Sequence, residues 1–261
     1  MPDFSKYYER YSFWANFALM KALFSEKSNI RKQALGNRHR DYARLADKPR
    51  LFELHRELNA LLVQATSSWK SHDYGEGYFY QGLQALGITG LRDTDARVEA
   101  MDLKRRVRDQ SVLEIGCNSG FLSLAIAADA ERVVGFDINP HLIRMAMRAA
   151  DFLERDNVSF HQSSFEAFET EERFDVVLSF ANHSTADGNT EQSLEDYFAR
   201  CAELTRPGGR LLFESHPPAH EGDGLTLALE AIERHFEIEE KEVLDYGNFL
   251  DGGRTFASCR R

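Results

Sequence analysis

The fold of this chain is decided by two stretches: VLEIGCNSG, at residues 112–120, and VVGFD, at residues 133–137. The first is an apolar run ending in a turn with two glycines, and the second is an apolar run ending in the carboxylate of Asp137. A helix fits between them. In a parallel sheet, the carboxyl ends of two such strands lie side by side and bind the nucleoside half of a cofactor. The pattern therefore predicts an α/β fold with a nucleoside-binding site at these strand ends.

The spacing of the two glycines narrows the kind of cofactor. A dinucleotide fingerprint needs Gly-x-Gly-x-x-Gly, whereas Cys117, Asn118 and Ser119 stand between the two glycines here. With Glu114 in front, the segment resembles motif I of the class I S-adenosylmethionine (SAM) methyltransferases, and the resemblance covers roughly residues 105–261. A strand-to-helix turn that binds no ligand is the alternative.

This resemblance implies a Rossmann-like sheet, mostly parallel with an antiparallel last strand, that binds SAM and releases S-adenosylhomocysteine. In the family, the motif I turn passes the methionine part of SAM, and the acidic residue ending the second strand binds the ribose hydroxyls. The corresponding cofactor residues here are Glu114, Gly116, Cys117, Asn118, Gly120, Asp137 and Ile138. Glycine lets the backbone approach a ligand closely, and a carboxylate accepts from two neighbouring hydroxyls at once. Asn118 stands where the family often has a third glycine, and Asn tolerates left-handed backbone.

Strand and helix patterns alternate downstream of about residue 105, as in repeated βαβ units. The expected strands are 111–116, 132–137, 157–162, 174–180, 209–215, 236–243 and 253–259. The expected helices are 119–129, 140–155, 191–205 and 224–234. Pro140 suits the first turn of its helix, and the Pro-Gly-Gly at 207–209 is expected to end the helix before it.

Two segments precede this predicted SAM-binding domain at 105–261. Residues 1–70 are expected to form a helical extension, whose aromatic stripe at 4–25 either packs on the core or forms a lid over the substrate. Residues 71–104 mix glycines with aromatic side chains and are expected to form a flap over the cofactor and a connecting helix.

The flap supplies candidates for both ligands. Tyr74 and Tyr78 are the substrate candidates, since their rings offer flat amphipathic faces. Arg92, or alternatively Arg97, is the candidate partner of the SAM carboxylate. A connecting loop whose arginine is paired with an acidic residue of the protein is the competing interpretation.

The adenine and acceptor ends of the site are expected after the third, fourth and fifth strands. The resemblance suggests an adenine contact near Ser164, Phe165 and Glu166, with Ser164 where the family usually has an acid, and it adds Phe180 to the cofactor residues. Asn182, His183 and His216 follow two carboxyl strand ends. A hydroxyl acceptor benefits from a base near neutral pH, so His183 is the first catalytic candidate and His216 the second. No metal ligand set is indicated, because the prolines between His216 and His220 prevent a helical His pair.

The composition excludes several classes of protein. The 261 residues can bury one large core, and the net charge of −10 makes wholesale binding to nucleic acid unfavourable. Three cysteines without Cys-x-x-Cys spacing indicate neither a disulfide framework nor a zinc site. The charged first ten residues do not resemble a signal peptide, and no uncharged run reaches the length of a transmembrane segment. A cytoplasmic location is therefore expected.

Residues 27–56 depart from this acidic balance, with nine basic residues against three acidic ones. The basic residues are Lys27, Arg31, Lys32, Arg38, Arg40, Arg44, Lys48, Arg50 and Arg56. Such a run is usually a solvated helix face. The functional alternatives are an anionic acceptor, a peripheral contact with a membrane surface that presents a glycan, or tRNA.

The sequence therefore predicts a SAM-dependent methyltransferase that acts on an oxygen of a sugar, glycan or other small polar acceptor. A tRNA-modifying methyltransferase is the second hypothesis. A SAM-binding scaffold or regulator without turnover is the hypothesis from another class.

Overall fold

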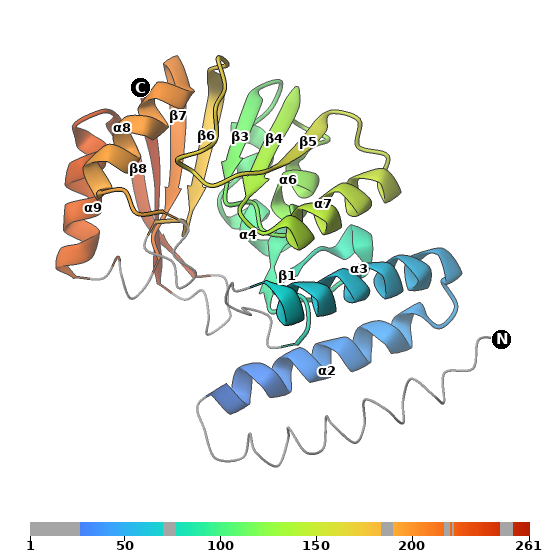
Figure 1. Cartoon of the computed structure of the whole chain (residues 1–261). Coiled ribbons are helices and arrows are strands. Elements are labelled where there is room, and N and C mark those ends of the chain that lie inside the picture. Colours follow the sequence, from blue (N-terminus) through green and yellow to red (C-terminus); the bar gives the residue numbers. More distant parts are fainter. Residues whose placement is uncertain (1–26, 70–76, 184–189, 217–219, 221, 246–252) are drawn as a thin grey trace.

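The structure, a computed structural model, describes residues 27–69, 77–183, 190–216, 220, 222–245 and 253–261. Its centre is a seven-stranded sheet with the order β5-β4-β3-β6-β7-β9-β8 (Figure 1). The strands are β3 (Ser111–Ile115), β4 (Arg132–Asp137), β5 (Val158–Gln162), β6 (Phe174–Phe180), β7 (Thr205–Glu214), β8 (Glu237–Leu244) and β9 (Arg254–Arg260). The pairs from β5 to β7 are parallel, and β9 is antiparallel to both of its neighbours. The predicted mostly parallel sheet is thus confirmed.

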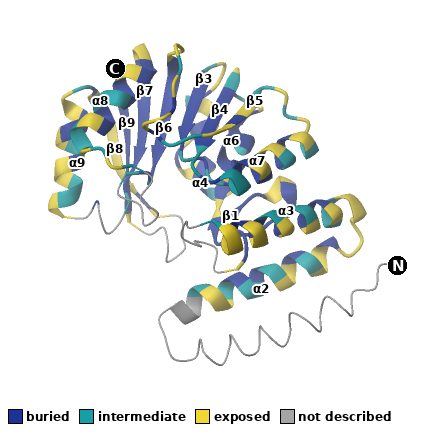
Figure 2. Cartoon of the chain, in the orientation of Figure 1, coloured by how far each residue is buried: buried dark blue, intermediate teal, exposed yellow. Residues whose placement is uncertain are grey.

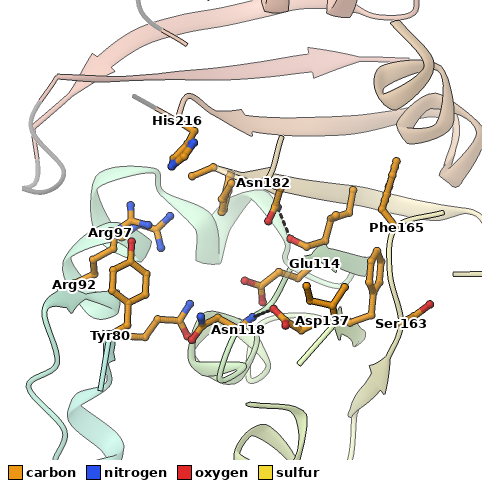
Figure 3. A pocket seen from close by; sticks show the side chains of 17 residues that line it. Tyr80, Arg92, Arg97, Glu114, Asn118, Asp137, Ser163, Phe165, Asn182 and His216 are labelled. Atoms are coloured by element: carbon orange, nitrogen blue, oxygen red, sulfur yellow. Dashed lines mark hydrogen bonds between the residues drawn. The ribbon is translucent and has the colours of Figure 1, made fainter. Parts of the chain in front are cut away.

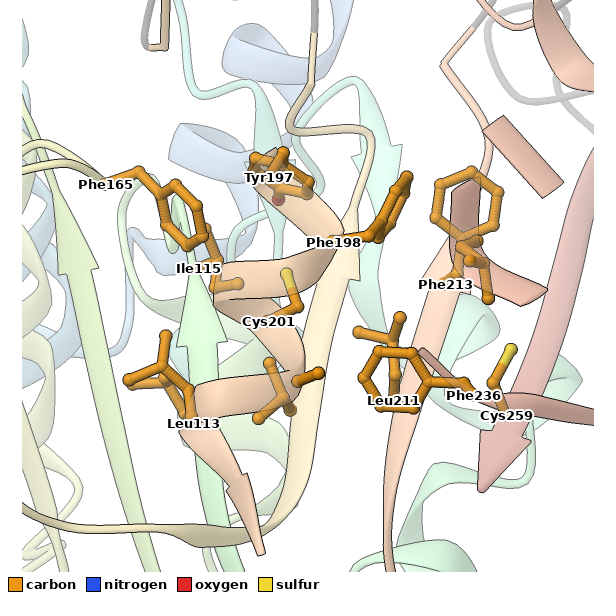
Figure 4. Packing of buried hydrophobic residues seen from close by; sticks show 14 of the residues in the cluster. Leu113, Ile115, Phe165, Tyr197, Phe198, Cys201, Leu211, Phe213, Phe236 and Cys259 are labelled. Atoms are coloured by element: carbon orange, nitrogen blue, oxygen red, sulfur yellow. The ribbon is translucent and has the colours of Figure 1, made fainter. Parts of the chain in front are cut away.

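Different helices cover the two faces of the sheet. Successive residues of a strand point to opposite faces. Leu113 packs in the cluster that contains α8 (Leu194–Leu204) and α9 (Asp223–Glu233), part of which Figure 4 shows. Val112 packs in the cluster that contains α4 (Thr94–Ala100), α5 (Leu103–Arg106) and α6 (Phe121–Ile126). Burial on both faces explains why these strands are almost continuous apolar runs.

All seven expected strands form, while several element ends differ from the prediction. Helix α6 begins at Phe121 rather than at 119, because Asn118 and Gly120 have left-handed backbone with φ of 53° and 71°. Helix α7 (Pro140–Phe152) begins at Pro140 as expected, with Asn139 as its N-cap. The helix expected at 191–205 ends before the Pro-Gly-Gly at 207–209, as predicted. That helix ends at Leu204, and these three residues belong to β7, whose pairing with β6 is irregular at this point.

The N-terminal part that the structure describes begins with α2 (Lys27–Leu45) and α3 (Pro49–Ser68), whose outer surfaces are exposed (Figure 2). Apolar residues of α3 and α7 share one buried cluster, which joins these helices to the sheet domain. In the described part of the chain, no helix has the length and apolar character needed to cross a membrane. The aromatic helix expected at 4–25 lies outside the described residues.

A short connection runs from α3 to the sheet domain through β1 (Gln81–Gly82), a 3₁₀ turn at Gln84–Leu86 and β2 (Arg92–Asp93). The buried carboxylate of Asp41 on α2 accepts hydrogen bonds from Tyr78 Oη at 2.7 Å, from Thr89 N at 2.7 Å and from Thr89 Oγ1 at 2.5 Å. The segment that leads into the site is therefore fixed to the N-terminal helices by a buried carboxylate.

Candidate active site

The turn after β3 brings backbone N–H groups to the carboxyl end of the sheet. Gly116 has φ of 64° and Asn118 has φ of 53°, so the chain reverses sharply between strand and helix. A Cβ on Gly116 would overlap the Oδ1 atom of Asn182, whose Nδ2 donates to Ile115 O. The residue after β6 thus lies directly against the turn after β3, and glycine is the residue that leaves room for it.

Asp137, at the end of β4, is held by this turn. Its Oδ2 accepts from Asn118 N at 2.9 Å, and its Oδ1 accepts from Asn139 N at 2.9 Å. Each carboxylate oxygen can accept more than one hydrogen bond, so a carboxylate fixed by two backbone donors keeps the capacity to bind a pair of hydroxyls. This donor and acceptor set fits the ribose of a nucleoside cofactor.

A side chain from the N-terminal segment completes the turn. Gln81 Oε1 accepts from Ser119 Oγ at 3.0 Å and from Phe121 N at 3.3 Å. Phe121 is the first residue of α6, so Gln81 satisfies one of the N–H groups that a helix leaves unpaired at its start. Tyr80 and Gln81 both face the site, which was not predicted from the sequence.

A pocket opens between the carboxyl ends of β3, β4, β6 and β7 (Figure 3). Its lining residues are Tyr80, Gln81, Arg92, Arg97, Glu114, Ile115, Gly116, Asn118, Phe136, Asp137, Ile138, Ser163, Phe165, Phe180, Ala181, Asn182 and His216. Of the predicted site residues, those that line it are Arg92, Glu114, Gly116, Asn118, Asp137, Ile138, Phe165, Phe180, Asn182 and His216. Apolar and aromatic groups lie beside Asp137, as an adenine ring would require.

Two arginines of the pocket share one buried carboxylate. Glu214, at the end of β7 and 0% exposed, accepts from Arg97 at 2.7 Å and from Arg92 at 3.3 Å on both of its oxygens. The guanidinium of Arg92 also lies over the ring of Tyr80, 5.7 Å from its centroid. Both arginines thus line the pocket and are paired with an acidic residue of the protein, as the competing interpretation of this segment expected. The partner Glu214 was not predicted, because it is 117 residues from Arg97 in the sequence.

Other predicted residues lie nearby without lining the pocket. Cys117 is fully buried, and burial raises the pKa of its thiol well above the usual value. A Cβ on Gly120 would lie 2.6 Å from Ala146 and Phe160, so its smallness serves packing between α6, α7 and β5. The hydroxyl of Ser164 accepts from Ala167 N, and its neighbour Ser163 lines the pocket instead.

The remaining predictions also differ from the observed placement. Glu166 is exposed and accepts from Thr190 and Glu191. The Tyr78 ring is buried, its hydroxyl donates to Asp41 on α2, and the residue does not line the pocket. His183 contacts the backbone O of Gln192 at 3.1 Å through its Nε2. Tyr74 lies outside the described residues.

Glu114, in β3, is a buried titratable group of the pocket. Burial raises its pKa to about 7, against the opposing effects of a hydrogen bond from Ser123 and the charge of Arg97. A carboxyl whose pKa is higher in the folded than in the unfolded state stabilises the protein at low pH. That stability is lost as the pH rises from about 4.5 to about 7.

We expect Glu114→Gln to remove this pH dependence. Over that interval, the free energy of unfolding of the unsubstituted protein should fall by about 3 kcal/mol relative to the variant. Urea unfolding of both proteins at a series of pH values measures the difference. Parallel curves for the two proteins would contradict the assignment.

Comparisons with known proteins concern the domain that carries this site. The family described as "Methyltransferase domain" matches residues 107–246. The chain is 30% identical over 123 residues to a ubiquinone biosynthesis O-methyltransferase of Aromatoleum aromaticum, covering 46% of this chain and 49% of that protein. It is 30% identical over 133 residues to the release factor glutamine methyltransferase of Fusobacterium nucleatum, covering 47% and 37%. The chain thus spans about half or less of the length of these relatives.

The fold comparison extends further along the chain. The N-methyltransferase NodS from Bradyrhizobium japonicum, in complex with S-adenosylhomocysteine, superimposes with a TM-score of 0.52 at 19% identity, covering 63% of this chain and 86% of that one. A methyltransferase from Listeria monocytogenes gives a TM-score of 0.53 at 15% identity, covering 65% and 99%. These likenesses concern the fold.

Proposed function

Because the chain belongs to the SAM-dependent methyltransferase family, we propose that it methylates an oxygen of a sugar, glycan or other small polar acceptor. The observation that supports this most is that one pocket holds both the cofactor turn and His216, at the carboxyl end of β7. The relatives named as ubiquinone biosynthesis O-methyltransferases act on oxygen, which agrees with the proposal.

The cofactor end of the pocket fits SAM, whose sulfonium supplies the methyl group when it is bound. Asp137 would accept from the ribose hydroxyls, and Ile138 and Phe165 would pack against the adenine. Arg92 or Arg97 would pair with the carboxylate of the cofactor. The chain's main contribution is to hold the acceptor oxygen in line and to exclude water.

The acceptor end makes His216 the first candidate base. His183, the first candidate from the sequence, does not line the pocket. Its Nε2 is hydrogen-bonded to the backbone O of Gln192, and because a carbonyl oxygen only accepts, that nitrogen carries a proton. His216 does line the pocket. We therefore propose that His216 removes the proton from the acceptor hydroxyl as the methyl group is transferred, with Asn182 orienting the acceptor.

The test is an assay with methyl-labelled SAM and a panel of sugars, nucleotide-sugars and phenols, read by mass spectrometry. We expect a methylated small hydroxyl compound. His216→Ala should lower kcat by about 10² to 10⁴-fold, as for loss of a general base, with the affinity for SAM unchanged. His161→Ala, an exposed histidine on β5, is the matched control and should keep the full rate. A full rate for His216→Ala would overturn the role of His216.

The N-terminal region supports one alternative acceptor. Arg31, Lys32, Arg44, Lys48 and Arg56 are exposed on α2, on α3 or between them. Such a surface favours a polyanion, so tRNA is the second candidate, and unmodified tRNA forms a further arm of the assay. We also propose that residues 1–70 select the acceptor and that 71–104 connect them to the SAM-binding domain at 105–261. Methyl incorporation into tRNA alone would replace the small-acceptor proposal.

A further inference from the structure

Three histidines gather where the chain leaves β6 and β7. His183 follows β6, and His216 and His220 follow β7. His220 is 4% exposed. Its ring lies parallel to that of His183 at 6.1 Å between centroids, and 5.6 Å from that of Phe213. His220 therefore packs against aromatic rings and does not line the pocket, while His216 does (Figure 3).

His220 is hydrogen-bonded to both the backbone N–H and the backbone carbonyl of His216. Its Nδ1 accepts from His216 N at 3.0 Å, and its own backbone N–H donates to His216 O at 2.9 Å. An Nδ1 that accepts from an N–H carries no proton, so the neutral ring has its proton on Nε2. Burial, with smaller effects of His183 and His216, lowers the pKa of His220 to about 4. The ring thus remains a neutral acceptor near pH 7.

Ser215, the residue before His216, is hydrogen-bonded to strand β9. Ser215 N donates to Thr255 O at 2.8 Å, and Ser215 Oγ accepts from Thr255 N at 2.9 Å. Strand β9 therefore fixes Ser215, and His220 fixes His216. A backbone held at two successive residues sets the direction in which the His216 side chain leaves the sheet. Misplacement of a reacting group by about 1 Å can lower a rate by about 10²-fold.

We propose that His220 is a positioning residue for methyl transfer, because its imidazole holds the His216 backbone so that the His216 ring faces the pocket. The inference rests on the proposed function only in taking His216 as the base. His220 is not among the residues that line the pocket. Its role is to act through His216.

Three variants of His220 distinguish the effect of its hydrogen bond to His216 N from the effect of its ring packing. His220→Phe keeps an aromatic ring against Phe213 and removes the acceptor, His220→Ala removes both, and His220→Asn offers Oδ1 in place of Nδ1. We expect backbone amide hydrogen exchange at His216, measured by NMR on the full chain with S-adenosylhomocysteine, to rise about tenfold or more in the Phe and Ala variants. His220→Asn should restore most of the protection. Exchange at Leu212, inside β7, should stay unchanged in all three.

Turnover provides the second readout. With the acceptor found in the panel, His220→Phe should lower kcat by about tenfold or more while KM for SAM stays unchanged, and His220→Asn should recover most of the rate. Unchanged exchange at His216 in His220→Phe, or no recovery in His220→Asn, would overturn the inference. If His216→Ala kept its rate while exchange still responded to His220, the base assignment would fail and the hold on the His216 backbone would stand.

Discussion

Glu214→Ala is expected to lower the free energy of unfolding by about 3–5 kcal/mol, the usual effect of removing one partner from a buried ion pair. Glu214 is the carboxylate between Arg92 and Arg97, and all three side chains are 5% exposed or less. Without it, two guanidiniums remain buried with their shared counter-charge gone. The variant should also lose affinity for S-adenosylhomocysteine, because both arginines line the pocket.

Guanidinium chloride unfolding measures this change. The matched control is Glu172→Ala, which removes the half-exposed partner of Arg132 at 2.6 Å. An exposed pair contributes about 0–1 kcal/mol, so the control should stay within that range. Equal losses in the two variants would show that Glu214 does not anchor the arginines.

Gly116→Ala is the second substitution with a large expected effect, this time on cofactor binding. The residue has φ of 64°, where a non-glycine residue costs about 1–2 kcal/mol, and its new Cβ would overlap Asn182 Oδ1. Asn182 is hydrogen-bonded to Ile115 O and has little room to retreat. The turn and the pocket wall must therefore separate, and we expect affinity for S-adenosylhomocysteine to fall about tenfold or more.

Gly208→Ala controls for backbone strain alone. Its φ is 77°, but a Cβ there would meet nothing within 4 Å. Both variants should therefore lose a similar increment of stability from the left-handed backbone. Only Gly116→Ala should lose affinity for S-adenosylhomocysteine. Equal affinity in the two variants would contradict the close contact with Asn182.

The sheet and the cofactor turn were predictable because their signals are local. Apolar runs ending at Gly116 and Asp137 specify two neighbouring parallel strands, and the parallel order then places Asn182 and His216 at the same end of the sheet. The start of α6 was less predictable, since it depends on left-handed backbone at Asn118. The start of β7 was also less predictable, since an irregular pairing with β6 lets the strand begin at Thr205, before Pro207.

The rest of the site depends on contacts between distant residues. Glu214 meets Arg92 across 122 positions, and Gln81 meets Phe121 across 40, with no pattern in either neighbourhood. Tyr78 and Tyr80 look equivalent in the sequence, yet Asp41 on α2 draws Tyr78 away from the pocket. The choice between His183 and His216 likewise depends on a contact, that of the His183 ring with Gln192 O, and on which of the two residues lines the pocket.

The most direct test of the site is calorimetric titration with S-adenosylhomocysteine of the full chain, Asp137→Ala and Asp151→Ala, the last an exposed aspartate on α7. The full chain and Asp151→Ala should bind with similar affinity. Asp137→Ala should bind about 10²-fold more weakly or worse, since it would lose the proposed charge-assisted hydrogen bonds to the ribose and its hydrogen bond with Asn118 N. Undiminished binding by Asp137→Ala, or no binding by the unsubstituted chain, would contradict a cofactor site at the ends of β3 and β4.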